Sequence, residues 1–200
     1  MVRIAVLVSG GGTNLQALLD AQGRGELGPG RIVLVVSNRK AAYALTRAQE
    51  HGVETAVLSK VMQPDPALYD ETLCRMLQER QIDLVVLAGF LGIVGEQVLA
   101  AFPNRILNIH PALIPSFCGK GFYGLHVHEA VLARGCKVTG ATAHLVTAGV
   151  DEGPILLQKA VEVLPGDTPE TLQRRVMEQA EWILLPRAVR MLSEKLEEEK

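Results

Sequence analysis

Short, mainly apolar runs recur along this chain, at residues 4–8, 32–36, 54–58, 82–88 and 105–110. Each run is too short for a helix and is bounded by glycine or polar residues, as is typical of strands buried on both faces. Segments with helical periodicity follow the first three runs, beginning at residue 14 and covering 41–50 and 66–79. Because parallel strands are joined by helical crossovers, this alternation predicts an α/β fold with an open, mostly parallel twisted sheet and helices on both faces.

The second half of the chain has a different pattern. Prolines and glycines mark a long loop after residue 110, and two later strand-like runs separated by a turn predict a C-terminal antiparallel hairpin. The expected elements are a helix at 127–134, strands at 139–146 and 155–163, a helix capped by Thr168, and a charged tail at 191–200 that is a fraying helix end. No repeat or linker divides the sequence, so residues 1–200 are expected to form a single domain.

Composition and charge exclude several classes of protein. Hydrophobic residues make up 48% of the 200 residues, which supports a buried core and excludes a disordered chain. A net charge of -2 offers no basic field to nucleic acid, and no stretch has the length and apolarity of a membrane span. The three cysteines are spaced for neither a disulfide framework nor a Cys-x-x-Cys pair, and the first apolar run is too short for a signal peptide. We therefore expect a cytoplasmic protein that binds neither nucleic acid nor membrane.

A glycine cluster follows the first predicted strand, in the segment Ser9-Gly10-Gly11-Gly12-Thr13-Asn14. Main-chain N–H groups would converge there with the N-terminus of the next helix, which favours anion binding. The segment lacks the ending of a Walker loop, and Leu15 occupies the third glycine position of a dinucleotide fingerprint. A tight turn without a ligand is one interpretation. A single phosphate held by N–H groups and the Thr13 hydroxyl is the more specific one.

Asn108 and His110 end the fifth predicted strand. Side chains two residues apart share a face of a strand, and open α/β sheets bind ligands at the carboxyl edge. Asparagine donates hydrogen bonds without titrating, and histidine exchanges a proton near neutral pH. The pair is therefore suited to polarising a carbonyl under nucleophilic attack. The alternative is that both side chains only satisfy groups of the loop backbone.

A carboxylate near the imidazole would orient it and favour its charged form. Asp151 and Glu152 are the candidates, and spacing alone does not choose between them. His126, His128 and His144 suggest a metal hypothesis, but no His-Glu-x-x-His pattern is present, and positions i and i+2 do not share a helix face. No metal is expected, and His128 and His144 are interpreted as core residues or as supports of the site.

Four segments form a series along the chain: Ser9-Gly10-Gly11-Gly12-Thr13-Asn14-Leu15-Gln16-Ala17, Leu87-Ala88-Gly89-Phe90, Asn108-Ile109-His110-Pro111-Ala112-Leu113-Ile114-Pro115 and Asp151-Glu152-Gly153-Pro154-Ile155. In order and spacing, this series resembles the phosphoribosylglycinamide formyltransferase family across residues 2–190. The Asn-x-His-Pro segment alone marks the wider group of enzymes that use formyltetrahydrofolate. The glycine loop with Asn-Leu-Gln points to the enzymes that act on glycinamide ribonucleotide.

The resemblance implies a formyltransferase fold and transfer of the formyl group of 10-formyltetrahydrofolate, a co-substrate, to the amine of glycinamide ribonucleotide in purine biosynthesis. The implied partners are these small molecules alone, without a metal, for a monomer or homodimer. The implied ribonucleotide ligands are Gly12, Thr13, Asn14 and, after a one-residue shift, Glu181. The implied folate-binding residues are Leu91, Gly92, Ile93, Val94 and Asn108. Catalysis is assigned to an oxyanion site of Asn108 and His110, with His110 the proton donor and Asp151 raising its pKa.

The chain departs from the family pattern at three places. Gly92 stands where many members have arginine, and Pro66 stands where many have an arginine that meets the glutamate tail of the folate. Lys60 or Arg39 could take over that contact. The loop at 116–124 is longer than in compact members.

Three other functions are alternatives to glycinamide ribonucleotide formylation. They are a formyltetrahydrofolate hydrolase, a methionyl-tRNA formyltransferase, which would need a C-terminal domain and a basic surface, and a phosphometabolite-binding module without catalysis.

Overall fold

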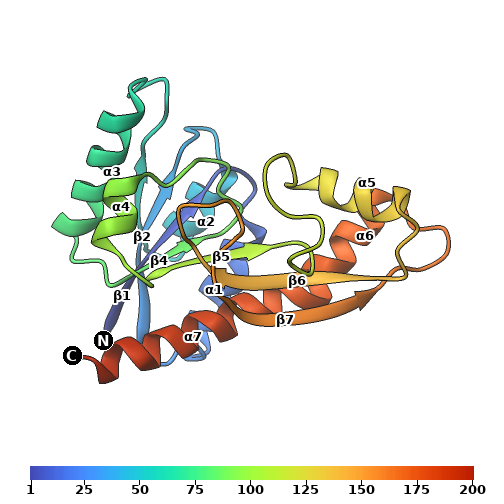
Figure 1. Cartoon of the computed structure of the whole chain (residues 1–200). Coiled ribbons are helices and arrows are strands. Elements are labelled where there is room, and N and C mark those ends of the chain that lie inside the picture. Colours follow the sequence, from blue (N-terminus) through green and yellow to red (C-terminus); the bar gives the residue numbers. More distant parts are fainter.

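A computed structural model describes residues 1–200. It contains one sheet of seven strands in the order β3-β2-β1-β4-β5-β6-β7 (Figure 1). The strands are β1 (Val2–Val8), β2 (Gly30–Ser37), β3 (Glu54–Val57), β4 (Leu84–Leu87), β5 (Ile106–His110), β6 (Val138–Leu145) and β7 (Ile155–Glu162). The first five strands pair in parallel, whereas β6 is antiparallel to both β5 and β7. The predicted mostly parallel sheet and the C-terminal hairpin are confirmed.

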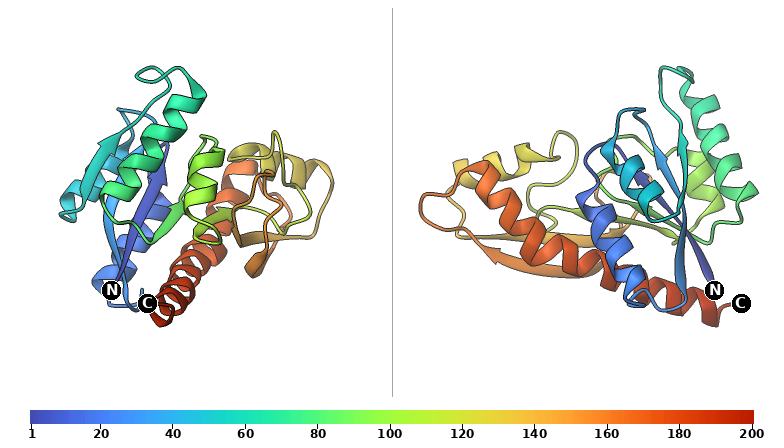
Figure 2. Two further views of the ribbon diagram at one scale, coloured as in Figure 1. Left: turned by 60° about the vertical axis from the view of Figure 1, so that its left-hand side comes forward. Right: turned by 180° about the vertical axis from the view of Figure 1, so that it is seen from behind.

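Helices cover both faces of the sheet, as the alternation of strands and helices predicts. They are α1 (Thr13–Gly23), α2 (Tyr43–Glu50), α3 (Pro66–Glu79), α4 (Glu96–Ala101), α5 (Leu125–Ala133), α6 (Pro169–Val176) and α7 (Trp182–Glu198), with a π-helical turn at Met177–Glu181 before α7. Alternate strand residues enter different cores. Val6 packs in the core with α1, α2 and α7, whereas Leu7 packs in the core with α3 and α4. The rear view of Figure 2 shows α1 and α7 side by side.

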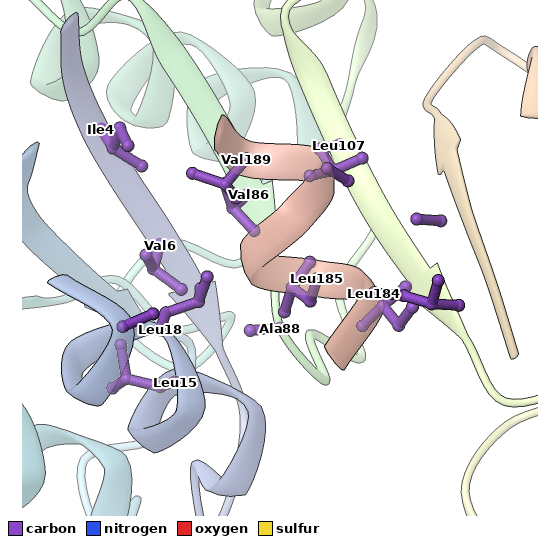
Figure 3. Close-up of a cluster of buried hydrophobic side chains, with 14 of the residues drawn as sticks. Ile4, Val6, Leu15, Leu18, Val86, Ala88, Leu107, Leu184, Leu185 and Val189 are labelled. Carbon is purple, nitrogen blue, oxygen red and sulfur yellow. The ribbon is translucent and has the colours of Figure 1, made fainter. Parts of the chain in front are cut away.

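The larger core lies between the sheet and α7. Leu184, Leu185 and Val189 on α7 pack with Val86 and Leu107 of the central strands (Figure 3). Fully burying one such side chain contributes about 1.5–3 kcal/mol, so this cluster fixes the C-terminal helix to the middle of the sheet. The π-helical turn, and with it Glu181, is thereby held at one end of α7.

Three parts of the structure differ from the sequence-based expectation. The six-residue helix α4 was not expected, because its N-terminus is held by a residue of another helix. The helix expected from Thr168 onward is broken by the π-helical turn. Residues 191–200 were expected to be a charged, fraying helix end, but α7 is ordered to Glu198, and Leu192 and Leu196 are buried. The amino group of Met1 contacts the Glu197 carboxylate, so the two termini lie together (Figure 1).

The strand order places a possible site at one edge of the sheet. In the sheet, β2 and β3 lie on one side of β1, and the next strand in the sequence, β4, lies on the other side. In open α/β sheets, ligands bind outside the carboxyl ends of the strands at such a switch point. Here the loops after β1 and β4 meet at that point. None of the helices combines the length and the apolarity needed to cross a bilayer.

Candidate active site

The loops after β1 and β4 are joined by a direct hydrogen bond. The Leu91 N–H donates to the hydroxyl of Ser9 over 2.8 Å, and Ser9 is buried. Ser9 opens the glycine cluster, and Leu91 opens the segment for which the family resemblance implies folate binding. The bond therefore couples the predicted anion site to the predicted folate site, although Ser9 was singled out only as part of a motif.

Asn108, His110 and Asp151 come together at the end of β5. Asn108 and His110 share the face of β5 that also carries Ile106, and the turn between β6 and β7 brings Asp151 against them. The His110 Nδ1 atom lies 3.5 Å from Asp151 Oδ2, and the Asn108 Nδ2 atom lies 3.5 Å from Asp151 Oδ1. Glu152, the other candidate, is exposed. The geometry thus selects Asp151 as the carboxylate that faces the imidazole.

The long loop at 116–124 supplies backbone groups to the same cluster. The His110 Nε2 atom lies 2.8 Å from the carbonyl oxygen of Phe117, and the Gly119 N–H donates to Asp151 Oδ2 over 3.0 Å. A carbonyl oxygen only accepts, so Nε2 carries a proton. The neutral imidazole then presents the lone pair of Nδ1 toward Asp151. The sequence alone gave no signal for these two main-chain contacts.

Burial dominates the electrostatics of His110. It lowers the pKa of the imidazole, and this effect outweighs the attraction of Asp151 and the bond to Phe117, which raise the pKa. For Asp151, burial raises the pKa, but the proximity of His144, the bond from the Gly119 N–H and the proximity of His110 together bring it below its ordinary value. Near pH 7 the pair therefore consists of a neutral imidazole and a carboxylate. Asp151 does raise the histidine pKa as expected, but burial more than cancels that contribution.

Two adjoining cavities open beside these side chains. One of about 250 Å³ is lined by His110, Asp151 and Leu91, and one of about 160 Å³ is lined by His144 and Val94. Both cavities are also lined by Gly92, Ile93, Asn108 and Asp151. The implied folate-binding residues thus line the same two cavities as the catalytic candidates.

A buried carboxylate on α3 holds the backbone that directly follows Val94. Asp70 Oδ1 accepts from the Gly95 N–H over 2.9 Å, and Asp70 Oδ2 accepts from the Gln97 N–H over 2.8 Å. Asp70 therefore caps the start of α4, and any side chain at position 95 would collide with it. In the sequence, only its place among the apolar residues Tyr69 and Leu73 of α3 indicates that this carboxylate is buried.

The structure explains two of the departures from the family pattern. A side chain at Gly92 would approach the ring of Phe90 to 2.5 Å, so this backbone path excludes arginine unless Phe90 moves. Pro66 begins α3 behind Asp65, whose carboxylate accepts from the Ala67 N–H over 2.8 Å. Pro66 also lines a cavity of about 440 Å³ together with Arg39, Lys60 and Gly92. Both replacement cations named above face this cavity, and their side chains form no ion pair.

The glycine loop ends at the N-terminus of α1, beside the π-helical turn. Gly12 has φ +74°, and a Cβ atom there would lie 2.6 Å from the Cβ of Ala44, so only glycine fits. No side chain caps this helix, which leaves its first N–H groups free to meet an anion. Thr13 is exposed, with its hydroxyl 3.7 Å from the sulfur of Met177.

Asn14 and Glu181, both implied as ribonucleotide ligands, are in contact although they are far apart in the sequence. The Asn14 Nδ2 atom donates to Glu181 Oε2 over 2.7 Å, and the Asn14 Oδ1 atom is buried without a partner. Burial raises the pKa of Glu181 to about 7, although the bond from Asn14 opposes the shift. Asn14 and Glu181 thus form a buried pair next to the N-terminus of α1, where the first N–H groups are not capped by a side chain.

This raised pKa has a consequence for stability. An acid whose folded-state pKa is raised destabilises the fold when it ionises, so stability falls as pH rises from the ordinary value of 4.5 to about 7. In the unsubstituted protein, the free energy of unfolding should fall by about 3 kcal/mol across that interval. We expect Glu181→Gln to abolish this fall. Urea unfolding of both proteins at pH 5 and pH 8 measures the difference. Glu178→Gln, at an exposed position of the same turn, is the control, and an unchanged pH dependence in Glu181→Gln would contradict the assignment.

The remaining histidines have other surroundings. His126 is exposed and pairs with Glu129 over 3.0 Å, whereas His128 is fully buried and neither of its ring nitrogens has a partner. His144 is buried and faces Asn108. No group of three or more His, Cys, Asp or Glu side chains is arranged to hold a metal ion.

Comparison with known proteins gives a consistent result. The Formyl transferase family matches residues 2–189. The chain is 42% identical to a chloroplastic phosphoribosylglycinamide formyltransferase of Arabidopsis thaliana over 88% of its own length and 60% of the relative's. It is 36% identical to the phosphoribosylglycinamide formyltransferase of Haemophilus influenzae over 97% of its own length and 88% of the relative's.

A solved structure agrees with these matches. The crystal structure of glycinamide ribonucleotide transformylase 1 from Symbiobacterium toebii superposes with a TM-score of 0.91 at 48% identity, covering 98% of this chain and 89% of that one. Some relatives are much longer, because the chain spans only 18% of the trifunctional purine biosynthetic protein adenosine-3 of Bos taurus, at 41% identity. The predicted resemblance and the predicted fold class are confirmed.

Proposed function

The chain belongs to the formyl transferase family, and on that premise we propose that it transfers the formyl group of 10-formyltetrahydrofolate to the amine of glycinamide ribonucleotide. The observation that carries the proposal is the cluster of Asn108, His110 and Asp151 beside two cavities at the sheet edge. The names of the relatives that match most of the chain support the choice of acceptor. The reaction belongs to purine biosynthesis.

The ribonucleotide is assigned to the loop after β1. Free N–H groups at the start of α1, with Gly12 and Thr13, suit a phosphate, because the helix N-terminus carries partial positive charge. Asn14 and Glu181 lie directly below, and we assign them to the same substrate. The phosphate end and the reacting amine would then lie at opposite ends of one site that runs along the sheet edge.

The formyl folate is assigned to the two cavities beside Asn108. Leu91, Gly92, Ile93 and Val94 line them. The segment is held at its start by the bond from the Leu91 N–H to Ser9 and just after its end by the bond from the Gly95 N–H to Asp70. A pterin ring carries donors and acceptors along its edge, and a rigid main chain recognises such a pattern at little entropic cost. The lack of arginine at position 92 leaves this main-chain contribution intact.

The first chemical step is attack of the neutral amine on the formyl carbon. The new N–C bond pushes the carbonyl electron pair onto oxygen, and the Asn108 Nδ2–H is placed to donate to this oxyanion. The attacking nitrogen becomes positive and must lose a proton. His110 is suited to accept it, because it lines the cavity and its Nδ1 lone pair is free beside Asp151, while its Nε2 is held by Phe117.

The second step returns that proton. The imidazolium is stabilised by Asp151, 3.5 Å from Nδ1. When the bond between the formyl carbon and the folate nitrogen breaks, the electron pair goes to that nitrogen, which takes the proton from His110 Nδ1. His110 is thus the proton donor to the leaving group and ends neutral, and no charge remains to be balanced by a metal ion.

The setting follows from the same arguments. We propose that residues 1–200 form one formyltransferase domain that acts in the cytoplasm on small molecules, as a monomer or homodimer, without nucleic acid or membrane. The free cysteines Cys74, Cys118 and Cys136 are consistent with a reducing compartment.

Initial rates with and without the ribonucleotide test the proposal. Conversion of 10-formyltetrahydrofolate to tetrahydrofolate, followed by absorbance, is expected only when glycinamide ribonucleotide is present. Turnover without the ribonucleotide would identify a hydrolase that uses water instead. Ribonucleotide binding in a calorimeter without any turnover would identify a binding module, and either outcome would overturn the proposal.

A further inference from the structure

His144 lies directly opposite Asn108 in the sheet. The two residues are register partners of the antiparallel strands β5 and β6, so their side chains emerge next to each other on one face. His144 is 2% exposed, and its Nδ1 atom lies 2.9 Å from the carbonyl oxygen of Leu145. A carbonyl oxygen only accepts, so Nδ1 carries a proton. With the ring proton on Nδ1, the Nε2 atom of an uncharged ring is an acceptor.

The Asn108 amide nitrogen faces that acceptor. Asn108 Nδ2 lies 3.1 Å from His144 Nε2, whereas Asp151 Oδ1 lies 3.6 Å from the same ring nitrogen, beyond hydrogen-bond distance. The amide orientation is fixed independently, because the same Nδ2 atom also faces Asp151 Oδ1, and a carboxylate only accepts. Asn108 therefore donates one N–H to His144.

The second N–H of Asn108 is the one left for chemistry. Its present partner, Asp151 Oδ1, lies at 3.5 Å, the outer limit of a hydrogen bond, so this N–H can turn to a stronger acceptor at no large cost. A developing oxyanion is such an acceptor. Without His144, the amide could rotate about its side-chain torsions and present its oxygen to the oxyanion instead.

We propose that His144 is a positioning residue: as an Nδ1-protonated acceptor it holds one N–H of Asn108, so that the other N–H meets the oxyanion. This inference rests on the proposed formyl transfer. His144 acts on the reaction through Asn108.

A matched set of substitutions tests the inference. Gln places its amide oxygen near the position of Nε2, Asn reaches only as far as Nδ1, and Phe keeps the shape of the ring without an acceptor. We expect His144→Phe and His144→Asn to lower kcat by about 10²-fold, the cost of a misplaced catalytic group, with KM for the ribonucleotide unchanged. His144→Gln should recover to within about tenfold of the unsubstituted enzyme. Equal losses in all three variants would overturn the inference.

Two further measurements separate positioning from a general structural role. In an Asn108→Ala background, His144→Phe should cost no further activity, because the group that it positions is gone. Nitrogen NMR of the imidazole reads the tautomer without any turnover, and Nδ1-protonated His144 is the expected form. An Nε2-protonated ring would refute this inference alone. Absence of turnover in the unsubstituted enzyme would refute the proposed function.

Discussion

His110→Ala should lower kcat by about 10³-fold while leaving the affinity for glycinamide ribonucleotide nearly unchanged. The imidazole lines the cavity and carries a free Nδ1 lone pair beside Asp151, so its loss removes both the proposed acceptor of the amine proton and the proposed donor to the leaving nitrogen. The phosphate site lies at the start of α1, away from this ring. Steady-state rates and calorimetric titration with the ribonucleotide measure the two quantities.

His51→Ala is the matched control. His51 is exposed at the end of α2, where its Nδ1 contacts the carbonyl oxygen of Arg47, and its loss should leave kcat unchanged. If His110→Ala retained the kcat of the control, proton transfer through His110 would be excluded. A loss of ribonucleotide binding would show instead that the substitution disturbs the whole sheet edge.

Asp151→Asn should lower kcat by about 10²-fold and also lower the pKa of His110. Asparagine keeps the shape of the side chain but removes the charge that stabilises the imidazolium. Burial already lowers the pKa of His110, and the attraction of Asp151 is the largest effect that opposes it. With that attraction gone, burial acts with less opposition and the neutral imidazole becomes more stable.

NMR titration of the His110 ring measures this second effect without substrate. The titration midpoint should move to lower pH in Asp151→Asn and stay in place in Glu152→Gln, the exposed neighbour. A midpoint that rises or stays fixed in Asp151→Asn would mean that the carboxylate does not act on the imidazole. In that case the 3.5 Å contact would have no electrostatic role.

The sheet could be predicted from sequence because its strands are buried on both faces. Val6 and Leu7 enter opposite cores, so neither position tolerates a polar residue and the run is wholly apolar. The helix α4 could not be predicted, because its cap is Asp70 from α3, a contact that exists only after folding. The ordered end of α7 depends in the same way on tertiary packing, because Leu192 and Leu196 are buried in the core.

Most residues of the candidate site could be named from the sequence, but the contacts between them could not be predicted. Asn108 and His110 stand together in one strand, but the choice of Asp151 over Glu152 depends on how the turn folds. The contact between Asn14 and Glu181 depends on the π-helical turn.

The fate of the formyl carbon tests the central claim most directly. The enzyme is mixed with 10-formyltetrahydrofolate labelled with carbon-13 in the formyl group, together with glycinamide ribonucleotide, and the reaction is followed by carbon NMR. The account predicts that the label moves to the amide of the formylated ribonucleotide, in step with release of tetrahydrofolate. Label that appears as formate, or that stays on the folate, would contradict it.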